Sequence, residues 1–124
     1  MVCDTNLLIY AGEPSDVVCA PFVESPDAVI ASVTRIELPG FPGSGQLAPE
    51  RQAKLREIVA PTVEAPLDDG IIRRAILLRQ QHKRSLGDSI IAATALEFDV
   101  TLITRNTGDF KHIAGFQLIN PFPE

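Results

Sequence analysis

Four acidic residues stand where their carboxylates could act together. Asp4 directly follows the apolar run at the N-terminus, and Glu37 lies about one helical turn beyond the apolar run 28–31. Asp88 opens an alanine-rich segment, and Asp109 follows the last strongly apolar run. Functional groups of open α/β sheets collect at the carboxyl ends of the strands, so these four side chains are expected to converge on one sheet edge.

Such a cluster of carboxylates would need a counter-charge. Two unit charges ~5 Å apart at an effective dielectric constant of ~20 repel by about 3 kcal/mol, and six such pairs would cost up to about 20 kcal/mol. That exceeds a typical domain stability of ~5–15 kcal/mol, so the cluster requires protonation, basic partners or a bound cation. All-oxygen ligands favour a hard cation such as Mg²⁺ or Mn²⁺ over zinc. Mg²⁺ held by a few carboxylates and several waters is typical of phosphoryl chemistry.

Each acid also has a purely structural interpretation. Asp is among the best N-cap residues, so Asp4 and Asp88 could simply cap helices. The segment from Thr34 to Glu37 matches the S/T-x-x-E capping box, and Asp109 beside a glycine is a typical turn residue. Only the joint placement of all four acids at one sheet edge separates the functional interpretation from the structural one.

The elements that must position these acids follow from changes in the apolar period. Strands are predicted at 1–3, 28–31, 63–67, 100–104 and, more weakly, 116–119, and helices at 6–11, 15–23, 49–60, 68–83 and 87–98. The Pro- and Gly-rich residues 39–45 are predicted to form a loop. Strands that alternate with helices predict an α/β fold, a mostly parallel sheet with helices on both faces, within a single domain spanning 1–124.

The composition is that of an ordinary globular protein. Of 124 residues, 45% are apolar and 22% are charged, which argues against disorder. Acids exceed bases by 16 to 11, and the net charge of −5 argues against a nucleic-acid partner. An acid at position 4 and the lack of an apolar run of about 18 residues argue against a signal peptide and a membrane span, so a cytoplasmic location is expected. Cys3 and Cys19 lack the spacing of a zinc site or a disulfide framework, and we interpret them as small buried apolar residues.

Four segments that carry the acids resemble those of PIN-domain ribonucleases, in particular toxins of the VapC type. They are Asp4 to Tyr10, Ser32 to Leu38, Gly87 to Ala95 and Thr104 to Phe110, and the ending Leu118 to Pro121 is also similar. The resemblance covers nearly the whole chain, and four motifs in the right order are much more specific than any one of them. It implies a PIN-like three-layer α/β/α sandwich with a mostly parallel central sheet.

The resemblance also implies an activity, a cofactor and partners. These are Mg²⁺- or Mn²⁺-dependent cleavage of RNA, a homodimer, and inhibition by a small VapB-type antitoxin whose C-terminal segment lies over the active site. By position, the family's acidic residues match Asp4, Glu37, Asp88 and Asp109, and its supporting polar residues match Thr5, Asn6, Thr104 and Asn106. A bound cation would lower the pKa of a water molecule, and the products would carry a 5′-phosphate and a 3′-hydroxyl. The general base is left open, with Glu37 as one candidate.

Three positions depart from the family pattern. Gly87 stands where many relatives have Pro, and Cys3 where an aliphatic residue is common, and neither is expected to touch the chemistry. Pro39 replaces a common Leu and is expected to shorten or kink the helix that carries Glu37. We expect the consequence to fall on the nearby dimer or antitoxin surface rather than on Glu37 itself.

Basic residues gather before Asp88. The stretch between Asp69 and Asp88 contains no acid. The bases considered as RNA-binding candidates are Arg73, Arg74, Arg79, Lys83 and Arg84, together with Arg105 and Lys111 on either side of Asp109. They form either a solvated helix face or a track for RNA phosphates. His82 and His112 are interpreted as surface residues rather than metal ligands.

A different class of function is the alternative, either a degenerate PIN domain or another non-enzymatic α/β interaction module. A phosphoacceptor receiver would need paired acids after the first strand, where Asp4 stands alone. A haloacid-dehalogenase-like phosphatase would need a second Asp at position 6, where Asn6 stands. Without the four clustered acids, 12 acids face 11 bases, so the acidity of the chain no longer excludes RNA.

Overall fold

Short apolar runs form a parallel sheet at the centre of the molecule. In the computed structural model, which describes residues 1–12, 17–40 and 48–122, the sheet has five strands. They are β1 (Val2–Cys3), β2 (Val29–Ala31), β3 (Val63–Ala65), β4 (Leu102–Ile103) and β5 (Leu118–Ile119). The order is β3-β2-β1-β4-β5, and every neighbouring pair is parallel. The strands lie within the predicted apolar runs, and β1 is central.

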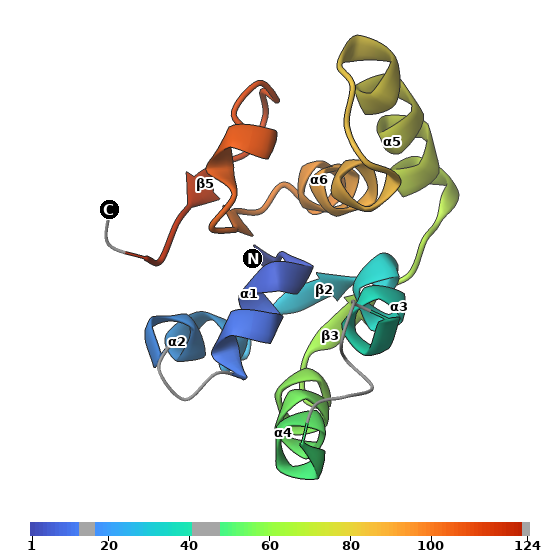
Figure 1. Cartoon of the computed structure of the whole chain (residues 1–124). Coiled ribbons are helices and arrows are strands. Elements are labelled where there is room, and N and C mark those ends of the chain that lie inside the picture. The colour runs from blue at the N-terminus through green and yellow to red at the C-terminus, as the bar shows by residue number, and fades with distance from the viewer. Residues whose placement is uncertain (13–16, 41–47, 123–124) are drawn as a thin grey trace.

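Helices cover both faces of this sheet (Figure 1). One face carries α1 (Thr5–Ala11), the 3-10 turn η1 (Val17–Cys19), α2 (Ala20–Val23) and α4 (Pro49–Val59). The other face carries α5 (Asp69–Gln81) and α6 (Leu86–Phe98). Two further elements directly follow strands or lie near their ends, α3 (Ser32–Gly40) after β2 and the 3-10 turn η3 (Thr107–Asp109) beyond β4. The predicted α/β/α sandwich is confirmed.

The central strands are buried on both faces, which explains their unbroken apolar sequence. Val2 and Leu102 pack among residues of α5 and α6, whereas their neighbours Cys3 and Ile103 pack among residues of α1, α2 and α4. This alternation is the period of two that a strand requires. Because both faces are covered, neither set of side chains reaches water, and no polar residue is needed between them.

The end of α6 nearest the acids is set by a serine. The Ser85 hydroxyl accepts a hydrogen bond from the backbone N–H of Asp88 at 3.0 Å, so Ser85 is the N-cap and α6 begins at Leu86. Small buried residues follow, and Ala92, Ala93 and Ala95 are completely buried. Their size allows α6 to approach the sheet closely, which brings Asp88 to the level of the strand ends.

Most predicted elements differ from the observed ones only at their ends, and two differ in other ways. The helix predicted at 15–23 is divided into η1 and α2, and residues 15 and 16 lie outside the described residues. The loop predicted at 39–45 begins later, because α3 continues to Gly40, and residues 41–45 lie outside the described residues. Pro39 therefore stands in the last turn of α3, where the helix ends, and the turn that carries Glu37 is complete.

Both cysteines are buried and neither is part of a disulfide, as the sequence predicts. Burial raises the pKa of the Cys3 thiol to about 12, so it stays protonated and packs as an apolar group. Within residues 1–12, 17–40 and 48–122, no helix has the length and apolar character needed to cross a membrane.

Candidate active site

Asp4 lies directly after the central strand and is almost completely buried, with 4% of its surface exposed. It occupies the N-cap position of α1 but makes no capping hydrogen bond with its side chain. Instead the Thr104 hydroxyl donates to Asp4 Oδ2 at 2.8 Å, a contact between residues 100 positions apart in the chain. Asp4 is therefore the N-cap residue of α1 by position, but its carboxylate is also held at the sheet edge by Thr104, the residue that follows β4.

Glu37 is held by a threonine pair. The Thr5 hydroxyl donates to Glu37 Oε1 at 2.7 Å, and the Thr34 hydroxyl lies 2.8 Å from that of Thr5. Since Thr5 has one hydroxyl proton and gives it to Glu37, Thr34 must be the donor in the second contact. The capping-box interpretation of the segment from Thr34 to Glu37 is wrong, because α3 already begins at Ser32 and both side chains point towards α1.

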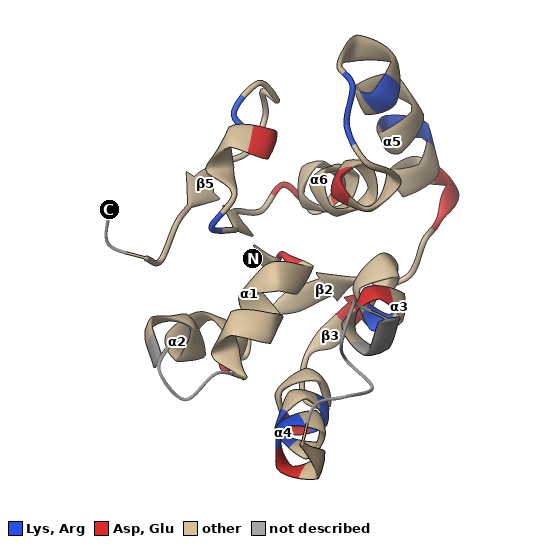
Figure 2. Cartoon of the chain, in the orientation of Figure 1, with Lys and Arg blue, Asp and Glu red and all other residues tan. Residues whose placement is uncertain are grey.

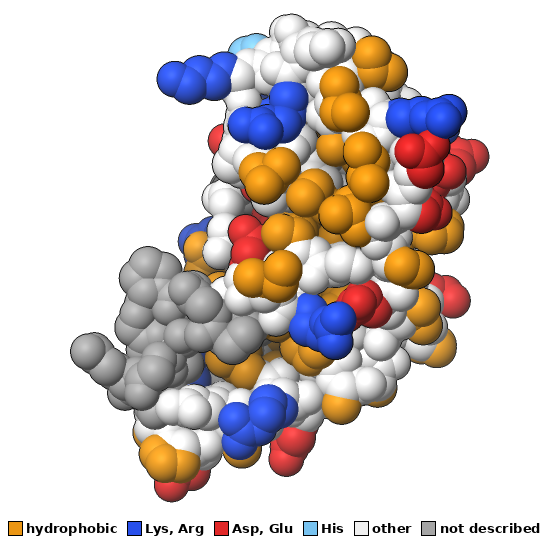
Figure 3. Space-filling view, turned by 90° about the vertical axis from the view of Figure 1, so that its right-hand side faces the viewer, with side chains coloured by type: hydrophobic (Ala, Val, Ile, Leu, Met, Phe, Trp, Pro, Cys, Tyr) orange, Lys and Arg blue, Asp and Glu red, His pale blue; other side chains and the backbone are white. Residues whose placement is uncertain are grey.

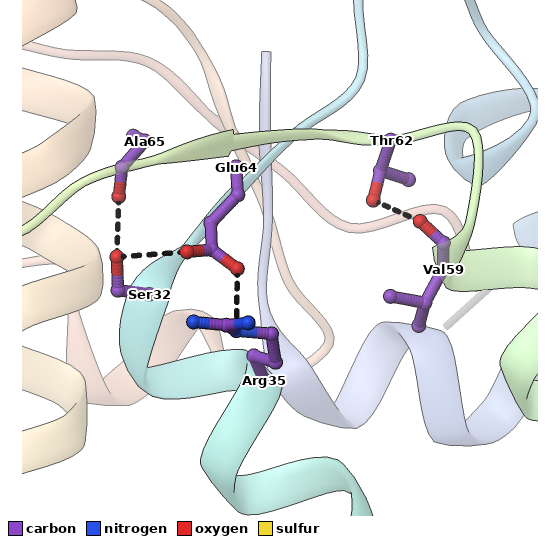
Figure 4. Close-up of polar contacts among 6 residues, drawn as sticks. All are labelled: Ser32, Arg35, Val59, Thr62, Glu64 and Ala65. Carbon is purple, nitrogen blue, oxygen red and sulfur yellow. Dashed lines mark hydrogen bonds and ion pairs between the residues drawn. The ribbon is translucent and has the colours of Figure 1, made fainter.

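The first turn of α3 is anchored to β3 by a second polar network (Figure 4). The Ser32 hydroxyl donates to the carbonyl oxygen of Ala65 at 2.8 Å. Arg35 pairs with Glu64, with 2.8 Å between Nε and Oε1. These contacts fix the direction in which α3 leaves the sheet, and so the position of Glu37 one turn later. In the same view the Thr62 hydroxyl donates to the Val59 carbonyl and closes the turn after α4.

Asp88 stands in the first turn of α6 without capping it, because Ser85 performs that role. The capping interpretation of Asp88 is wrong, and its half-buried carboxylate is available for other contacts. Burial raises the pKa of Asp88, and the negative charges of Asp109 and Glu37 raise it further, whereas hydrogen bonding with Ser85 and the charge of Arg84 lower it.

The charges of Glu37 and Asp88 act on Asp4, Glu37 also acts on Asp88, and Asp109 joins this group through its effect on Asp88. Burial raises the pKa of Asp4 to about 6, and the charges of Asp88 and Glu37 act in the same direction, whereas the hydrogen bond from Thr104 opposes them. Asp88 also feels Asp109, which is exposed. Solvent exposure thus increases from buried Asp4, through half-buried Glu37 and Asp88, to exposed Asp109.

The supporting polar positions divide into two groups. Thr5 and Thr104 hold Glu37 and Asp4, as described above, and the backbone N–H of Asn106 donates to the Thr104 hydroxyl at 3.0 Å. Asn6 is exposed on α1. Thr34 belongs to this network although sequence reasoning assigned it only a capping role. Its position three residues before Glu37, which places both on one helix face, was the available signal.

Gly87 is closer to the acids than the sequence led us to expect. A Cβ atom added to Gly87 would lie 2.6 Å from Glu37 Oε2. Gly87 therefore lies against one of the four acids, whatever role that acid has. The absence of a side chain at Gly87 leaves room for the second oxygen of Glu37, while the first oxygen accepts from Thr5.

The donor set suits a hydrated hard cation. In the described parts of the chain, no three His, Cys, Asp or Glu side chains are close enough to enclose a metal ion together. Mg²⁺, however, is usually bound through one or two carboxylates and keeps several waters, so it does not need such a cage. Burial raises the pKa of Asp4, and the charges of Asp88 and Glu37 raise it further, so a bound cation would offset an unfavourable charge. The residues present therefore fit Mg²⁺ or Mn²⁺ held partly through water.

The basic candidates fall into different environments (Figure 2). Arg73 pairs with Asp69 and Arg74 with Glu97, both at 2.7 Å. Glu97 is nine residues beyond Asp88 on α6, a rise of roughly 13 Å, so these two pairs lie towards the far end of the helix from the acids. Arg79, Lys83 and Lys111 are exposed, and Arg84 is half-buried beside Asp88.

Arg105 has an aromatic environment that sequence reasoning did not foresee. Its guanidinium lies 4.1 Å from the ring centroid of Phe122 and 5.1 Å from that of Tyr10. The two rings also contact each other edge to face at 5.2 Å. These cation–π contacts connect the C-terminal segment to α1 beside Thr104. They also occupy one face of the Arg105 guanidinium, which is one of the RNA-binding candidates.

A cavity of about 740 Å³ lies away from the acids. Its lining includes residues at the amino ends of the strands, among them Met1, Thr101 and Gln117, and none of the four acids. Two other carboxylates, Asp27 and Asp99, belong to its lining. This cavity is at the opposite edge of the sheet from the candidate site, so the two are separate features of the molecule.

The fold and these motifs define a known family. The PIN-domain family model matches residues 1–116, and the chain belongs to the PIN-domain family. PIN domains are generally nucleases that use divalent metal ions. No curated protein matches the chain.

Solved structures of similar fold come from toxin–antitoxin systems. A toxin–antitoxin complex from Klebsiella pneumoniae has a TM-score of 0.75 and 29% identity, covering 98% of this chain and 97% of that one. The VapBC2 complex of Rickettsia felis bound to promoter DNA has a TM-score of 0.77 and 22% identity over 96% of both chains. FitAcB of Neisseria gonorrhoeae has a TM-score of 0.74 and 23% identity over 97% and 96%. The last two matches, both under 25% identical, show the fold alone.

The buried acid predicts an unusual dependence of stability on pH. The pKa of Asp4 is higher in the folded protein, about 6, than its ordinary 3.8, so the folded state binds the proton more tightly. The stabilisation is complete below the ordinary value and is lost as the pH rises through about 6. Relative to Asp4→Asn, the wild-type free energy of unfolding in EDTA should fall by about 2 kcal/mol between pH 4 and pH 7. Urea unfolding at several pH values measures this difference, and a constant difference would show that Asp4 is not the buried titrating group.

Proposed function

We propose that this protein is a Mg²⁺- or Mn²⁺-dependent endoribonuclease toxin of the VapC type. It hydrolyses RNA phosphodiester bonds at the site formed by Asp4, Glu37, Asp88 and Asp109. The observation that carries this proposal is the burial of Asp4 among other acids, with its pKa raised to about 6. Such a concentration of carboxylates opposes folding unless a cation offsets it. Membership of the PIN-domain family supports the same chemistry.

Neighbouring residues of the chain would hold the carboxylates of the site in place. A divalent cation, if held by these carboxylates, would lower the pKa of a water molecule and would stabilise charge on the phosphodiester. Thr104 fixes Asp4, and Thr5 fixes Glu37 through Oε1. Glu37 Oε2 lies in the space that Gly87 leaves open. This second oxygen is the best placed to accept a proton from water, so we assign Glu37 as the candidate general base.

Attack by water defines the products. The proton of the attacking water passes to a carboxylate, the new bond forms between water oxygen and phosphorus, and the bond from phosphorus to the 3′ oxygen breaks. The 3′ oxygen leaves and takes up a proton, so one product carries a 5′-phosphate and the other a 3′-hydroxyl. A 2′,3′-cyclic phosphate would indicate a different nucleophile.

The first test compares RNA cleavage by matched variants. Protein freed of any antitoxin should cut RNA with Mg²⁺ or Mn²⁺ and not with EDTA. Asp4→Asn and Asp88→Asn should each lose at least about 100-fold in rate, the size typical of removing one electrostatic group from an active site. Asp99→Asn is the control, because Asp99 lines the cavity at the opposite sheet edge and has φ 54, a conformation that Asn also adopts.

The outcome of this comparison separates the alternatives. Equal cleavage by the wild type and by folded Asp4→Asn would indicate a contaminating nuclease and contradict the proposal. Absence of cleavage with every divalent ion would favour the non-enzymatic alternative, a degenerate PIN domain.

We further propose a VapB-type antitoxin as partner, since the similar solved structures are toxin–antitoxin complexes. In the same assay, protein still bound to its antitoxin should be inactive.

A homodimer is the second proposed assembly, and an apolar surface supports it. Figure 3 shows hydrophobic side chains gathered on the upper half of one side of the molecule. On α5 the exposed members are Ile72, Ile76 and Leu77, with 40%, 52% and 55% of their surface exposed. Their spacing places Ile72 and Ile76 on one helix face, away from the buried side. An exposed apolar patch of this kind is typical of an interface.

The dimer proposal predicts the mass of the protein in solution and a substitution that lowers this mass. In light scattering, the wild type should have twice the 13.4 kDa mass of one chain. Ile76→Glu should shift the protein towards the monomer, because a charge would have to be buried at the interface. Ile119→Glu is the matched control, since Ile119 is 40% exposed on β5 at the edge of the sheet. A wild type that remains monomeric at high concentration would contradict the proposal.

A further inference from the structure

The link between α5 and α6 forms a basic hollow on the surface. Residues 79–84 line a space of about 430 Å³, and Arg79, Lys83 and Arg84 are the charged residues among them. No acid belongs to this lining. On one side the hollow meets the segment that follows Asp109, because the His82 and His112 rings contact each other with 5.0 Å between their centroids.

Arg84 differs from the other arginines near α5 and α3. Arg35, Arg73 and Arg74 each form an ion pair with a carboxylate. The Nε and Nη1 atoms of Arg84 are buried and have no hydrogen-bond partner among the described residues. Burying charged N–H donors without an acceptor is unfavourable, so these two nitrogens are left without an acceptor by the described part of the chain.

The position of Arg84 connects the hollow with the acid site. Arg84 directly precedes the Ser85 cap of α6, and its charge lowers the pKa of Asp88 without an ion pair between the two. An anion bound here would therefore lie beside the carboxylates that act on the phosphodiester. The planar guanidinium, with its fork of donors, matches the oxygens of a phosphate group better than an ammonium does.

We propose that Arg84, with Arg79 and Lys83, binds a backbone phosphate of the polynucleotide next to the bond that is cut. This inference rests on the proposed function and identifies which basic residues recognise the substrate. Arg73 and Arg74 differ, because each already pairs with a carboxylate: Arg73 with Asp69 within α5, and Arg74 with Glu97 of α6. Arg84 is a substrate-binding residue in this account and takes no part in moving a proton.

The test measures RNA binding separately from cleavage. The anisotropy of a short labelled RNA is followed in EDTA, so that no bond is cut, at several salt concentrations. Arg84→Gln should weaken binding about 10-fold and reduce the slope of log affinity against log salt by about 0.7. Arg56→Gln is the matched control, because it removes the same charge from an exposed site on α4, and it should change neither quantity.

A conservative variant and a free anion sharpen the result. Arg84→Lys keeps the charge, so it should preserve the salt slope while losing part of the affinity, because an ammonium lacks the fork of donors. An unchanged affinity in this variant would contradict a specific role of the guanidinium. Inorganic phosphate at matched ionic strength should compete only at concentrations far above that of RNA. Competition at equal concentration would assign the hollow to a free anion and overturn the proposal.

The outcomes distinguish this inference from the proposed function. If the wild type cuts RNA but folded Arg84→Gln binds RNA with unchanged affinity and salt slope, the phosphate site is wrong and the nuclease assignment stands. If no metal supports cleavage but Arg84→Gln still loses RNA binding, the nuclease assignment fails and the phosphate site stands. A wild type that binds no RNA at all would overturn both. Circular dichroism of Arg84→Gln and Arg84→Lys verifies that each variant is folded.

Discussion

The burial of carboxylates close to one another at the carboxyl edge of the sheet is the constraint on which the rest of the site depends. Asp4 is the most affected, because it lies directly after the central strand and is almost completely buried. Two hydroxyl groups, from Thr104 and Thr5, donate to the acids, but neutral donors cannot cancel their charge. The fold therefore keeps negative charge at this edge at some cost in stability, as functional sites often do.

Much of the architecture could be predicted because its causes are local. Strands buried on both faces have continuous apolar runs, and helices buried along one stripe have periodic apolar residues. Both patterns can be recognised in the sequence. Local sequence patterns gave wrong or incomplete predictions where a side chain could form either a local capping hydrogen bond or a hydrogen bond to a residue distant in the sequence. Asp4 and Thr34 fit helix caps, yet their side chains bond to Thr104 and Thr5, which are distant in sequence. Asp88 was displaced from the cap by a better-placed Ser85.

The environments of the charged surface residues could not be predicted from local sequence either. The sequence groups Arg73, Arg74 and Arg84 into one basic stretch, but the fold gives them different environments. Glu97, on the neighbouring helix, neutralises Arg74, and only tertiary packing could bring the two together. Two nitrogens of Arg84, Nε and Nη1, have no hydrogen-bond partner among the residues that the structure describes, and its charge acts on Asp88. Acidic and basic groups thus meet at the start of α6, which is the arrangement that a phosphodiester with bound cations requires.

The central claim is that these acids hold a divalent cation, and Mn²⁺ binding tests it most directly. Isothermal titration calorimetry at pH 7 should show Mn²⁺ binding to the wild type and to Asp99→Asn, whose substitution lies at the other sheet edge. Binding to Asp4→Asn should be weaker by about 10-fold or more, because the most buried negative charge is lost. Equal Mn²⁺ affinity in the wild type and in folded Asp4→Asn would contradict the account.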